Sequence, residues 1–272
     1  SSTTQKMGII SKLVSSSSLE QLASRIGKGA VQLIDNRLAT GDPGTILVTC
    51  EHADNLLPTN YSFTSQKYEG CQFGGKTELK DAHWAFDPGA LSASKELSKA
   101  LSGVMIASKF SRLLIDVNRP IPSDTLIRSH CDGVPVQMNE NIDLDEVAHR
   151  IDNYYTPFHL TLGAIKMSIQ PSMLLSVHSF NKQYPGGPDR DYEVGVLCTT
   201  EDDLASEFTE QLEKAGISAR VNQPYSGKQG IMHSVESGSC AFDGSSKLPC
   251  LMFEFRNDVC VDQEWRDRAV AA

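Results

Sequence analysis

Two histidines in this sequence follow short apolar runs of the kind that form buried strands. His52 comes after the run 45–50, and His178 comes after the run 173–177. In an open α/β sheet, sites form where the carboxyl ends of the strands meet at one edge. Neutral imidazole is a preferred ligand of zinc, and a catalytic zinc keeps one position open for water. The two histidines therefore predict a metal centre at that edge, with one zinc ion per chain as the expected cofactor.

A third ligand has to come from another side chain near the first histidine. Five side chains there carry suitable donor atoms, and the residues alone leave the choice open: Glu51, Asn55, Asp81, His83 and Asp87. Asp87 also precedes Pro88 at the start of a predicted helix, so a helix cap is an alternative role for it.

Two more apolar runs lead into charged residues. The run 112–117 leads into Arg119, and the run 250–253 leads into Glu254. If all four runs are strands, four polar clusters converge on one place, as a catalytic site requires. For Glu254 the alternative is an ion pair with Arg256 on the surface of the strand.

The elements that must position these residues alternate along the chain. Strands are predicted at 45–50, 112–117, 173–177, 194–198, 217–221 and 249–253. Helices are predicted at 18–37, 88–101, 144–165, from a cap at Thr200 to Gly216, and at 262–270. Apolar strands without polar alternation, separated by helices, are typical of a largely parallel sheet covered on both faces. The predicted fold class is α/β, with one domain and a mixed, mostly parallel central sheet.

The domain organisation follows from the same pattern. Residues 1–17 are rich in Ser and Thr and are predicted to form a flexible arm, whereas 18–272 form the catalytic domain. The polar stretch 59–82 and the Pro-rich stretch 120–142 are predicted to be long loops over the active site.

Composition narrows the class of protein. The 25 Lys and Arg residues against 34 Asp and Glu residues leave a formal charge of −9, which disfavours nucleic acids and anionic membranes as partners. No apolar run reaches the roughly 18 residues of a membrane span, and no signal peptide is visible. The seven cysteines are scattered and form no Cys-x-x-Cys pair, which argues against a cysteine zinc cluster and favours a reducing, cytoplasmic location. The oligomeric state is left open.

Six motifs occur in order over most of the chain. They are Glu51-His-Ala-x-Asn-x-x-Pro58, His83-x-Ala-Phe-Asp87-x-Gly-Ala90, Ser111-Arg-Leu-x-Ile-Asp-x-Asn-Arg-Pro120, Ser176-Val-His-Ser-Phe180, Asn222-x-Pro-Tyr-Ser-Gly227 and Glu254-x-Arg-x-Asp258. Together they resemble the N-formylglutamate amidohydrolase family, whose fold is similar to that of the zinc carboxypeptidases. The resemblance implies a phosphorylase/hydrolase-like sheet and an enzyme of histidine degradation that hydrolyses N-formyl-L-glutamate, or a close N-acyl amino acid.

The resemblance also implies a third ligand. Zinc carboxypeptidases have His-x-x-Glu as their first motif, whereas here His52 is followed at that spacing by Asn55, a poor zinc ligand. Related peptidoglycan amidases take an acidic ligand just before the helix that follows the first histidine, a place that Asp87 matches. The expected metal ligands are therefore His52, Asp87 and His178, with Glu51 and Asn55 as the alternatives.

Further roles follow from the chemistry of amide hydrolysis. Glu254 is the expected general base, and Arg112 is the expected stabiliser of the negative charge that forms on the carbonyl oxygen. A small acidic substrate needs cationic and polar partners, and a clamp on its carboxylate is expected from Arg guanidinium groups. The expected substrate-binding residues are Asn118, Arg119, Arg190, Tyr225 and His233, the last on the family resemblance alone.

Two alternatives to this function remain open on the sequence. One is a zinc carboxypeptidase-like amidase that acts on another small amide. The other is a binding protein that kept the fold and lost the metal, an alternative that rests on the neutral Asn55. Metal content distinguishes the last of these from either enzyme.

Overall fold

The structure is a computed structural model of the 272-residue chain, and it describes residues 18–37, 44–62, 67–68, 77–183, 186–239 and 248–272. The predicted arm, 1–17, lies outside the described residues. So does part of the predicted loop 59–82.

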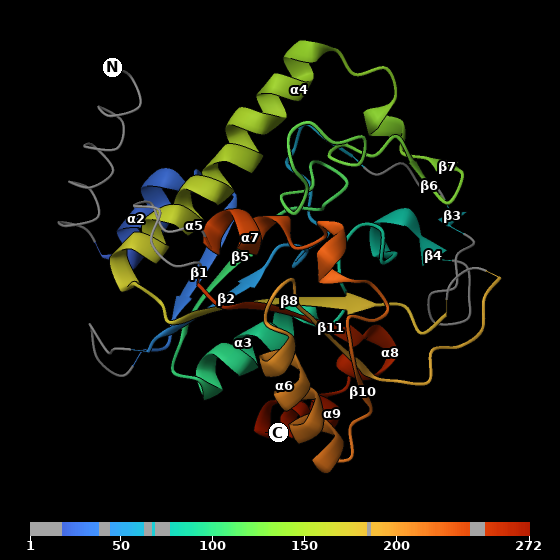
Figure 1. Cartoon of the computed structure of the whole chain (residues 1–272). Helices are drawn as coiled ribbons and strands as arrows, with labels where there is room; N and C mark the ends of the chain where they lie inside the picture. The colour runs from blue at the N-terminus through green and yellow to red at the C-terminus, as the bar shows by residue number, and fades with distance from the viewer. Residues whose placement is uncertain (1–17, 38–43, 63–66, 69–76, 184–185, 240–247) are drawn as a thin grey trace.

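A seven-stranded sheet forms the centre of the molecule, with the strand order β1-β5-β2-β8-β11-β9-β10 (Figure 1). The strands are β1 (Val31–Asp35), β2 (Ile46–Cys50), β5 (Val104–Ser108), β8 (Met173–Phe180), β9 (Val194–Leu197), β10 (Ala219–Val221) and β11 (Cys250–Arg256). The four central strands β5, β2, β8 and β11 are parallel. By contrast, β1 is antiparallel to β5, and β9 is antiparallel to β11. The predicted mixed, mostly parallel sheet is confirmed.

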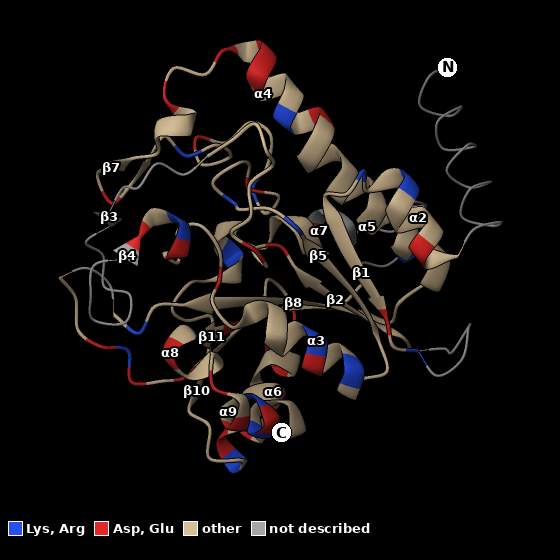
Figure 2. Cartoon of the chain, turned by 180° about the vertical axis from the view of Figure 1, so that it is seen from behind, with Lys and Arg blue, Asp and Glu red and all other residues tan. Residues whose placement is uncertain are grey.

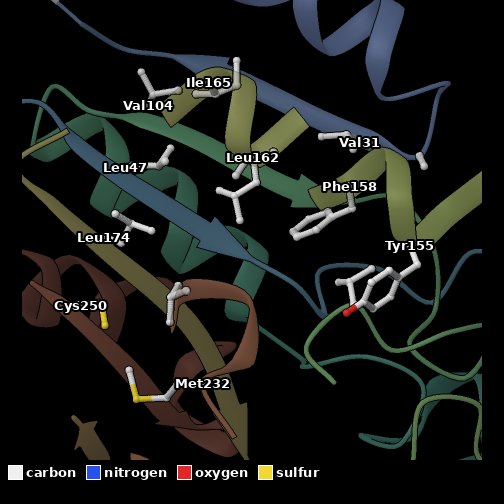
Figure 3. Packing of buried hydrophobic residues seen from close by; sticks show 14 of the residues in the cluster. Val31, Leu47, Val104, Tyr155, Phe158, Leu162, Ile165, Leu174, Met232 and Cys250 are labelled. Carbon is white, nitrogen blue, oxygen red and sulfur yellow. The ribbon is translucent and has the colours of Figure 1, made fainter. Parts of the chain in front are cut away.

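One face of this sheet is covered by α2 (Leu19–Ile26), α5 (Thr156–Ile169) and α7 (His233–Ser239). The side chains of α5 that face the sheet recur at helical spacing, as Phe158, Leu162 and Ile165, and all three are fully buried. They pack against Leu47 and Leu174 from the central strands (Figure 3). A second segment, α4 (Leu144–Arg150), leads into α5 through one π-helical turn, Ile151–Tyr155. The predicted helix 144–165 is confirmed, with this turn inside it.

The other face is covered by α3 (Ala90–Ala100), α6 (Asp202–Lys214), α8 (Asn257–Cys260) and α9 (Gln263–Ala271). Strand residues that alternate with the first set, such as Val48 and Leu175, point to this face and belong to the same buried cluster as Ala93 and Trp265. Burial on both faces explains why the strands are continuously apolar.

Two predicted elements are wrong. The run 112–117 is buried but forms turns, because its amides bond to loop carbonyls such as those of Ala85 and Leu126 instead of a neighbouring strand. The strand at that place in the sheet is β5, directly before the run. The predicted helix 18–37 ends at Ile26, and its second half contains β1, whose Val31 and Leu33 pack on the same face as the helix.

Loops gather at the end of the sheet toward which β8 points (Figure 1). They include two short hairpins, β3 (Lys67–Tyr68) with β4 (Thr77–Glu78) and β6 (His130–Cys131) with β7 (Val134–Pro135). The predicted loop 120–142 is confirmed at this end, apart from its short hairpin and one 3₁₀ turn.

The outer surface carries both signs of charge. Acidic and basic residues are interspersed on α2 and α3 (Figure 2). No helix in the described part of the chain is both long and apolar enough to cross a bilayer.

Candidate active site

Three buried side chains meet at the carboxyl ends of β2 and β8. His52 follows β2, His178 lies within β8 near its carboxyl end, and Asp87 comes from the segment before α3. Asp87 Oδ2 is 2.8 Å from His178 Nδ1 and 3.4 Å from His52 Nδ1. The imidazoles therefore turn their Nδ1 atoms toward one carboxylate.

The backbone around Asp87 holds the carboxylate in this position. Its amide donates to the carbonyl oxygen of His52, and Ser179 N–H donates to Oδ2 at 3.3 Å. Gly89 starts α3 with a φ of 83°, where a Cβ would lie 2.7 Å from the carbonyl oxygen of Cys260. Only glycine fits this turn without strain. Gly89, and not Asp87, is the N-cap residue of α3, so the alternative role of Asp87 as a helix cap is wrong.

Each histidine has a second carboxylate behind it. His52 Nε2 is 2.8 Å from Asp116 Oδ1, and His178 Nε2 is 3.1 Å from Glu51 Oε2. The second contact has the distance of an ion pair, although its angle is not that of a straight hydrogen bond. Glu51 also accepts hydrogen bonds from Ser176 Oγ and Ser234 Oγ. Carboxylates in these places orient an imidazole and leave its other nitrogen free to bind a metal.

The charges of this cluster are strongly coupled. Burial opposes ionisation of Asp87, but the charge of His52 and the hydrogen bond from His178 lower its pKa well below the usual range. Burial also opposes ionisation of Glu51, yet contacts with His178 lower the pKa of Glu51 to about 2. The site therefore holds buried negative charge, which stabilises a cation placed among these groups.

The three side chains fit a zinc ion. Their ligand atoms all lie within 4.8 Å of one another, and the donor set of two imidazoles and one carboxylate is one that zinc takes. Ligand atoms about 2.1 Å from a tetrahedral zinc lie about 3.4 Å apart, which is the His52 Nδ1–Asp87 Oδ2 distance of 3.4 Å, whereas His178 Nδ1 lies closer to Oδ2, at 2.8 Å. Arg112 Nη1 already places positive charge here, 3.2 Å from Asp87 Oδ1.

Glu254 stands beside this cluster without a partner of its own. It lies on β11 directly opposite His178 of β8, because the two strands are parallel and in register. The carboxylate lines the same cleft, and its Oε2 is buried with no hydrogen-bond partner in the described residues. Burial raises the pKa of Glu254 to about 7, which the charge of His178 opposes only in part. Arg256 pairs with Asp258 instead, so the alternative of a Glu254–Arg256 ion pair is wrong.

The other candidate ligands lie elsewhere. Asn55 donates to the carbonyl oxygen of Lys80 at 2.8 Å, and Asp81 is exposed. Glu51 lies behind His178, as described above. His83 lines the cleft, with Nδ1 3.5 Å from Asp87 Oδ1, and burial lowers its pKa to about 4. A neutral His83 is thus near the cluster but outside the group of three.

The chain was compared with models of known protein families. The model of the N-formylglutamate amidohydrolase family matches residues 44–261, which is most of the chain. The chain belongs to this family. It follows that the protein is a hydrolase that acts on amide C–N bonds, an amidohydrolase, with a small molecule as its substrate.

Two solved structures are similar to the N-formylglutamate amidohydrolase fold seen here. A gene product of Agrobacterium tumefaciens is 27% identical, with a TM-score of 0.74, over 90% of this chain and 92% of its own. An N-formylglutamate amidohydrolase from Ralstonia eutropha JMP134 is 16% identical, with a TM-score of 0.58, over 89% of this chain and 95% of its own. The second likeness shows the fold alone. The curated proteins include no match to this chain.

Two of the expected substrate-binding residues, Asn118 and Arg119, lie together in the lining of the amidohydrolase cleft. Among the described residues, Arg119 uses two of its five N–H groups, from Nε to Thr125 Oγ1 and from Nη1 to the carbonyl oxygen of Asn118. Three N–H groups are left for a ligand. Asn118 already bonds to the backbone at both ends of its amide, at Ile231 and Ser234. Its main contact is therefore with the segment that leads into α7.

The other three expected residues divide between the cleft and its surroundings. Arg190 and Tyr225 both line the cleft, and the Arg190 guanidinium lies 5.8 Å from the Tyr225 ring centroid. His233 does not line it. His233 Nε2 lies 2.9 Å from Tyr155 Oη, which donates to the carbonyl oxygen of Arg119. His233 is therefore linked to the backbone of Arg119 through the Tyr155 hydroxyl.

Sequence reasoning missed several residues of the cleft. Arg128, Trp84 and Asp132 line it from the loop segments, and Asn181 and Gln183 line it beyond β8. None of them follows an apolar run directly, so the pattern used to find the other residues carries no signal for them.

Replacing Asp87 with alanine is expected to weaken zinc binding by at least about 100-fold, more than the loss of an outer-shell partner costs. Asn55→Ala should leave the affinity nearly unchanged, because Asn55 bonds to Lys80 and not to the cluster. A competition titration with a chromogenic chelator measures both affinities. The reverse ranking would move the third ligand to Asn55.

Proposed function

We propose that this amidohydrolase hydrolyses N-formyl-L-glutamate, or a close N-acyl amino acid, to formate and L-glutamate, with one zinc ion held by His52, Asp87 and His178. The observation that carries the proposal is the placement of Glu254, a buried carboxylate without a partner, in the same cleft as these three residues and the arginines. Family membership supplies the reaction class.

The chemistry divides among the groups as follows. A bound zinc ion would polarise the formyl carbonyl and lower the pKa of the attacking water. Glu254 takes a proton from that water, for which a pKa near the working pH is best suited. The water oxygen forms a bond to the formyl carbon. The same proton then passes from Glu254 to the amide nitrogen, and the C–N bond breaks to leave formic acid and the amine. The proton of formic acid then passes to the amine, so the final products are formate and the ammonium form of glutamate.

Arg112 and Arg119 act on the two ends of the substrate. Arg112 lines the cleft next to Asp87, where its charge stabilises the oxyanion that develops on the carbonyl oxygen. Arg119, which also lines the cleft, offers its unused N–H groups to a substrate carboxylate. The products are small and polar.

A substrate screen tests the proposal directly. Formyl, acetyl and succinyl derivatives of L-glutamate are compared on protein stripped with a chelator and then reloaded with measured amounts of zinc. We expect release of formate in proportion to bound zinc, with the formyl compound hydrolysed fastest. Stoichiometric zinc without hydrolysis of any of the three would contradict it, and a lack of zinc binding would favour a binding protein of the same fold.

Replacing Arg119 with lysine is expected to raise KM for N-formyl-L-glutamate about tenfold or more, because lysine keeps the charge but loses the planar fork that matches a carboxylate. KM for a neutral N-formyl amino amide should change far less. Steady-state kinetics on both substrates decide the matter. Equal losses on the two would mean that Arg119 supports the fold.

We also propose a cytoplasmic location. It is supported by the five cysteines of the described residues, Cys50, Cys131, Cys198, Cys250 and Cys260, all of which are free thiols.

A further inference from the structure

We infer that Arg128 determines specificity for a substrate with a second carboxylate, and that it binds this carboxylate while Arg119 binds the first. The inference rests on the proposed function and adds to it the reason why a dicarboxylic substrate is preferred. Among the described residues, four arginines line the cleft: Arg112, Arg119, Arg128 and Arg190.

Arg128 differs from the other three in its partners. Arg112 pairs with Asp87 and lies near Asp116, Arg119 bonds to Thr125, and Arg190 donates to the carbonyl oxygen of Asn181. In the part of the chain that the structure describes, no carboxylate pairs with the Arg128 guanidinium. Its Nε is buried without a hydrogen-bond partner.

The surroundings of this guanidinium are unfavourable for an unpaired cation. Burial is the largest effect that lowers the pKa of Arg128, and the positive charges of Arg112 and Arg119 lower it further, whereas the negative charge of Asp116 opposes them in part. The Trp84 ring compensates in part, since the guanidinium lies 5.2 Å from its centroid. An anion in the cleft would therefore be attracted by Arg128 more strongly than by an arginine that is already paired.

The loop that carries Arg128 is held in place before any ligand binds. The Asn139 side chain donates to the carbonyl oxygens of Arg128 and Leu113, both at 2.7 Å. Asn139 in turn accepts a hydrogen bond from Arg150, which is 1% exposed. Because the loop is already ordered, little conformational entropy is lost when a ligand binds. More of the attraction between Arg128 and an anion then contributes to affinity.

Two unpaired guanidinium forks on one cleft match a small molecule with two carboxylates. Among the described residues, Arg119 has three unused N–H groups, and the Arg128 guanidinium forms no ion pair with a carboxylate. A neutral side chain in the place of the second carboxylate would leave the partly buried Arg128 guanidinium without an anion, which lowers affinity for such a substrate.

The kinetic test uses three substrates of nearly equal shape: N-formyl-L-glutamate, N-formyl-L-glutamine and N-formyl-L-isoglutamine. Arg128→Gln should lower kcat/KM for N-formyl-L-glutamate roughly 10- to 100-fold, as expected for a lost hydrogen bond to a charged group. The same variant should have a much smaller effect on the one monoamide that lacks the carboxylate bound by Arg128. Arg268→Gln is the matched control, because Arg268 is exposed on α9 and does not line the cleft. Equal losses on all three substrates would overturn the inference.

A binding measurement separates this inference from the proposed function. Calorimetry with glutarate and its monoamide should show that the wild-type protein prefers glutarate and that Arg128→Gln loses the preference. If the wild type hydrolyses no formyl substrate but shows this pattern, the proposed reaction is wrong and the role of Arg128 stands. If the wild type hydrolyses N-formyl-L-glutamate and Arg128→Gln keeps the preference for glutarate, the role of Arg128 is wrong and the reaction stands.

Discussion

Replacing Glu254 with glutamine is expected to lower kcat by about 10²–10⁴, the usual effect of removing a positioned general base. Glutamine fills nearly the same volume, so the end of β11 should keep its packing. It cannot accept a proton from the attacking water, and the chemical step loses its base. Zinc content and KM should stay close to those of the wild type, because Glu254 is outside the group of three ligands.

The pH profile gives this variant a second readout. Glu254 acts as a base only when it is deprotonated, so the activity of the wild type should fall as the pH falls through its pKa. Burial raises that pKa to about 7, and a bound cation would lower it, which places the acid limb at or below about pH 7. The variant should lack the limb. As a control, Glu264→Gln on exposed α9 should keep both kcat and the limb. Full zinc with near-normal kcat in Glu254→Gln would exclude Glu254 as the base.

Replacing either His52 or His178 with alanine is expected to remove both bound zinc and activity. Each variant lacks one of the three proposed zinc ligands. Its zinc affinity should therefore fall by more than the 10- to 100-fold that is typical when a residue hydrogen-bonded to a ligand is lost. Each also leaves a buried carboxylate without its partner, Asp116 behind His52 and Glu51 behind His178. Elemental analysis after dialysis measures the metal, and circular dichroism checks that the variant is folded.

A surface histidine gives the matched control for these two variants. His130→Ala should retain zinc and activity, because His130 is exposed on β6 and does not line the cleft. If one of the two alanine variants does not fold, glutamine at the same position keeps a polar group toward the buried carboxylate and can be measured in its place. Wild-type zinc stoichiometry in a folded variant would show that the replaced histidine is not a ligand.

Much of the fold and the centre of the site could be predicted from local pattern. The runs before His52, His178 and Glu254 are strands β2, β8 and β11, and the structure brings these three residues to one edge of the sheet. The prediction works because neighbouring parallel strands end on the same side. Residues near the carboxyl ends of neighbouring strands then lie close together, as His178 of β8 and Glu254 of β11 do.

The sequence pattern gave a wrong prediction where a buried apolar run does not form a strand. The run 112–117 resembles a strand and is buried apart from Arg112, yet its amides bond within loops. An apolar run reports only that its side chains avoid water, and it does not report which carbonyl oxygens its amides meet. The same limit explains β1, where apolar spacing suited a helix as well as a strand.

Sequence by itself therefore determined the class of the protein, the largely parallel sheet, and the histidines and glutamate at its edge. Only the tertiary structure shows which of Asp87, Glu51 and Asn55 lies with both histidines, since all three lie close to His52 or before a helix in sequence. Their roles depend on direction: Asp87 faces both Nδ1 atoms, Glu51 faces the opposite nitrogen of His178, and Asn55 turns away to Lys80. The partnerless guanidinium of Arg128 was likewise visible only in three dimensions. Whether a charged side chain has a partner depends on how distant segments pack together, and this cannot be predicted from residue type and spacing.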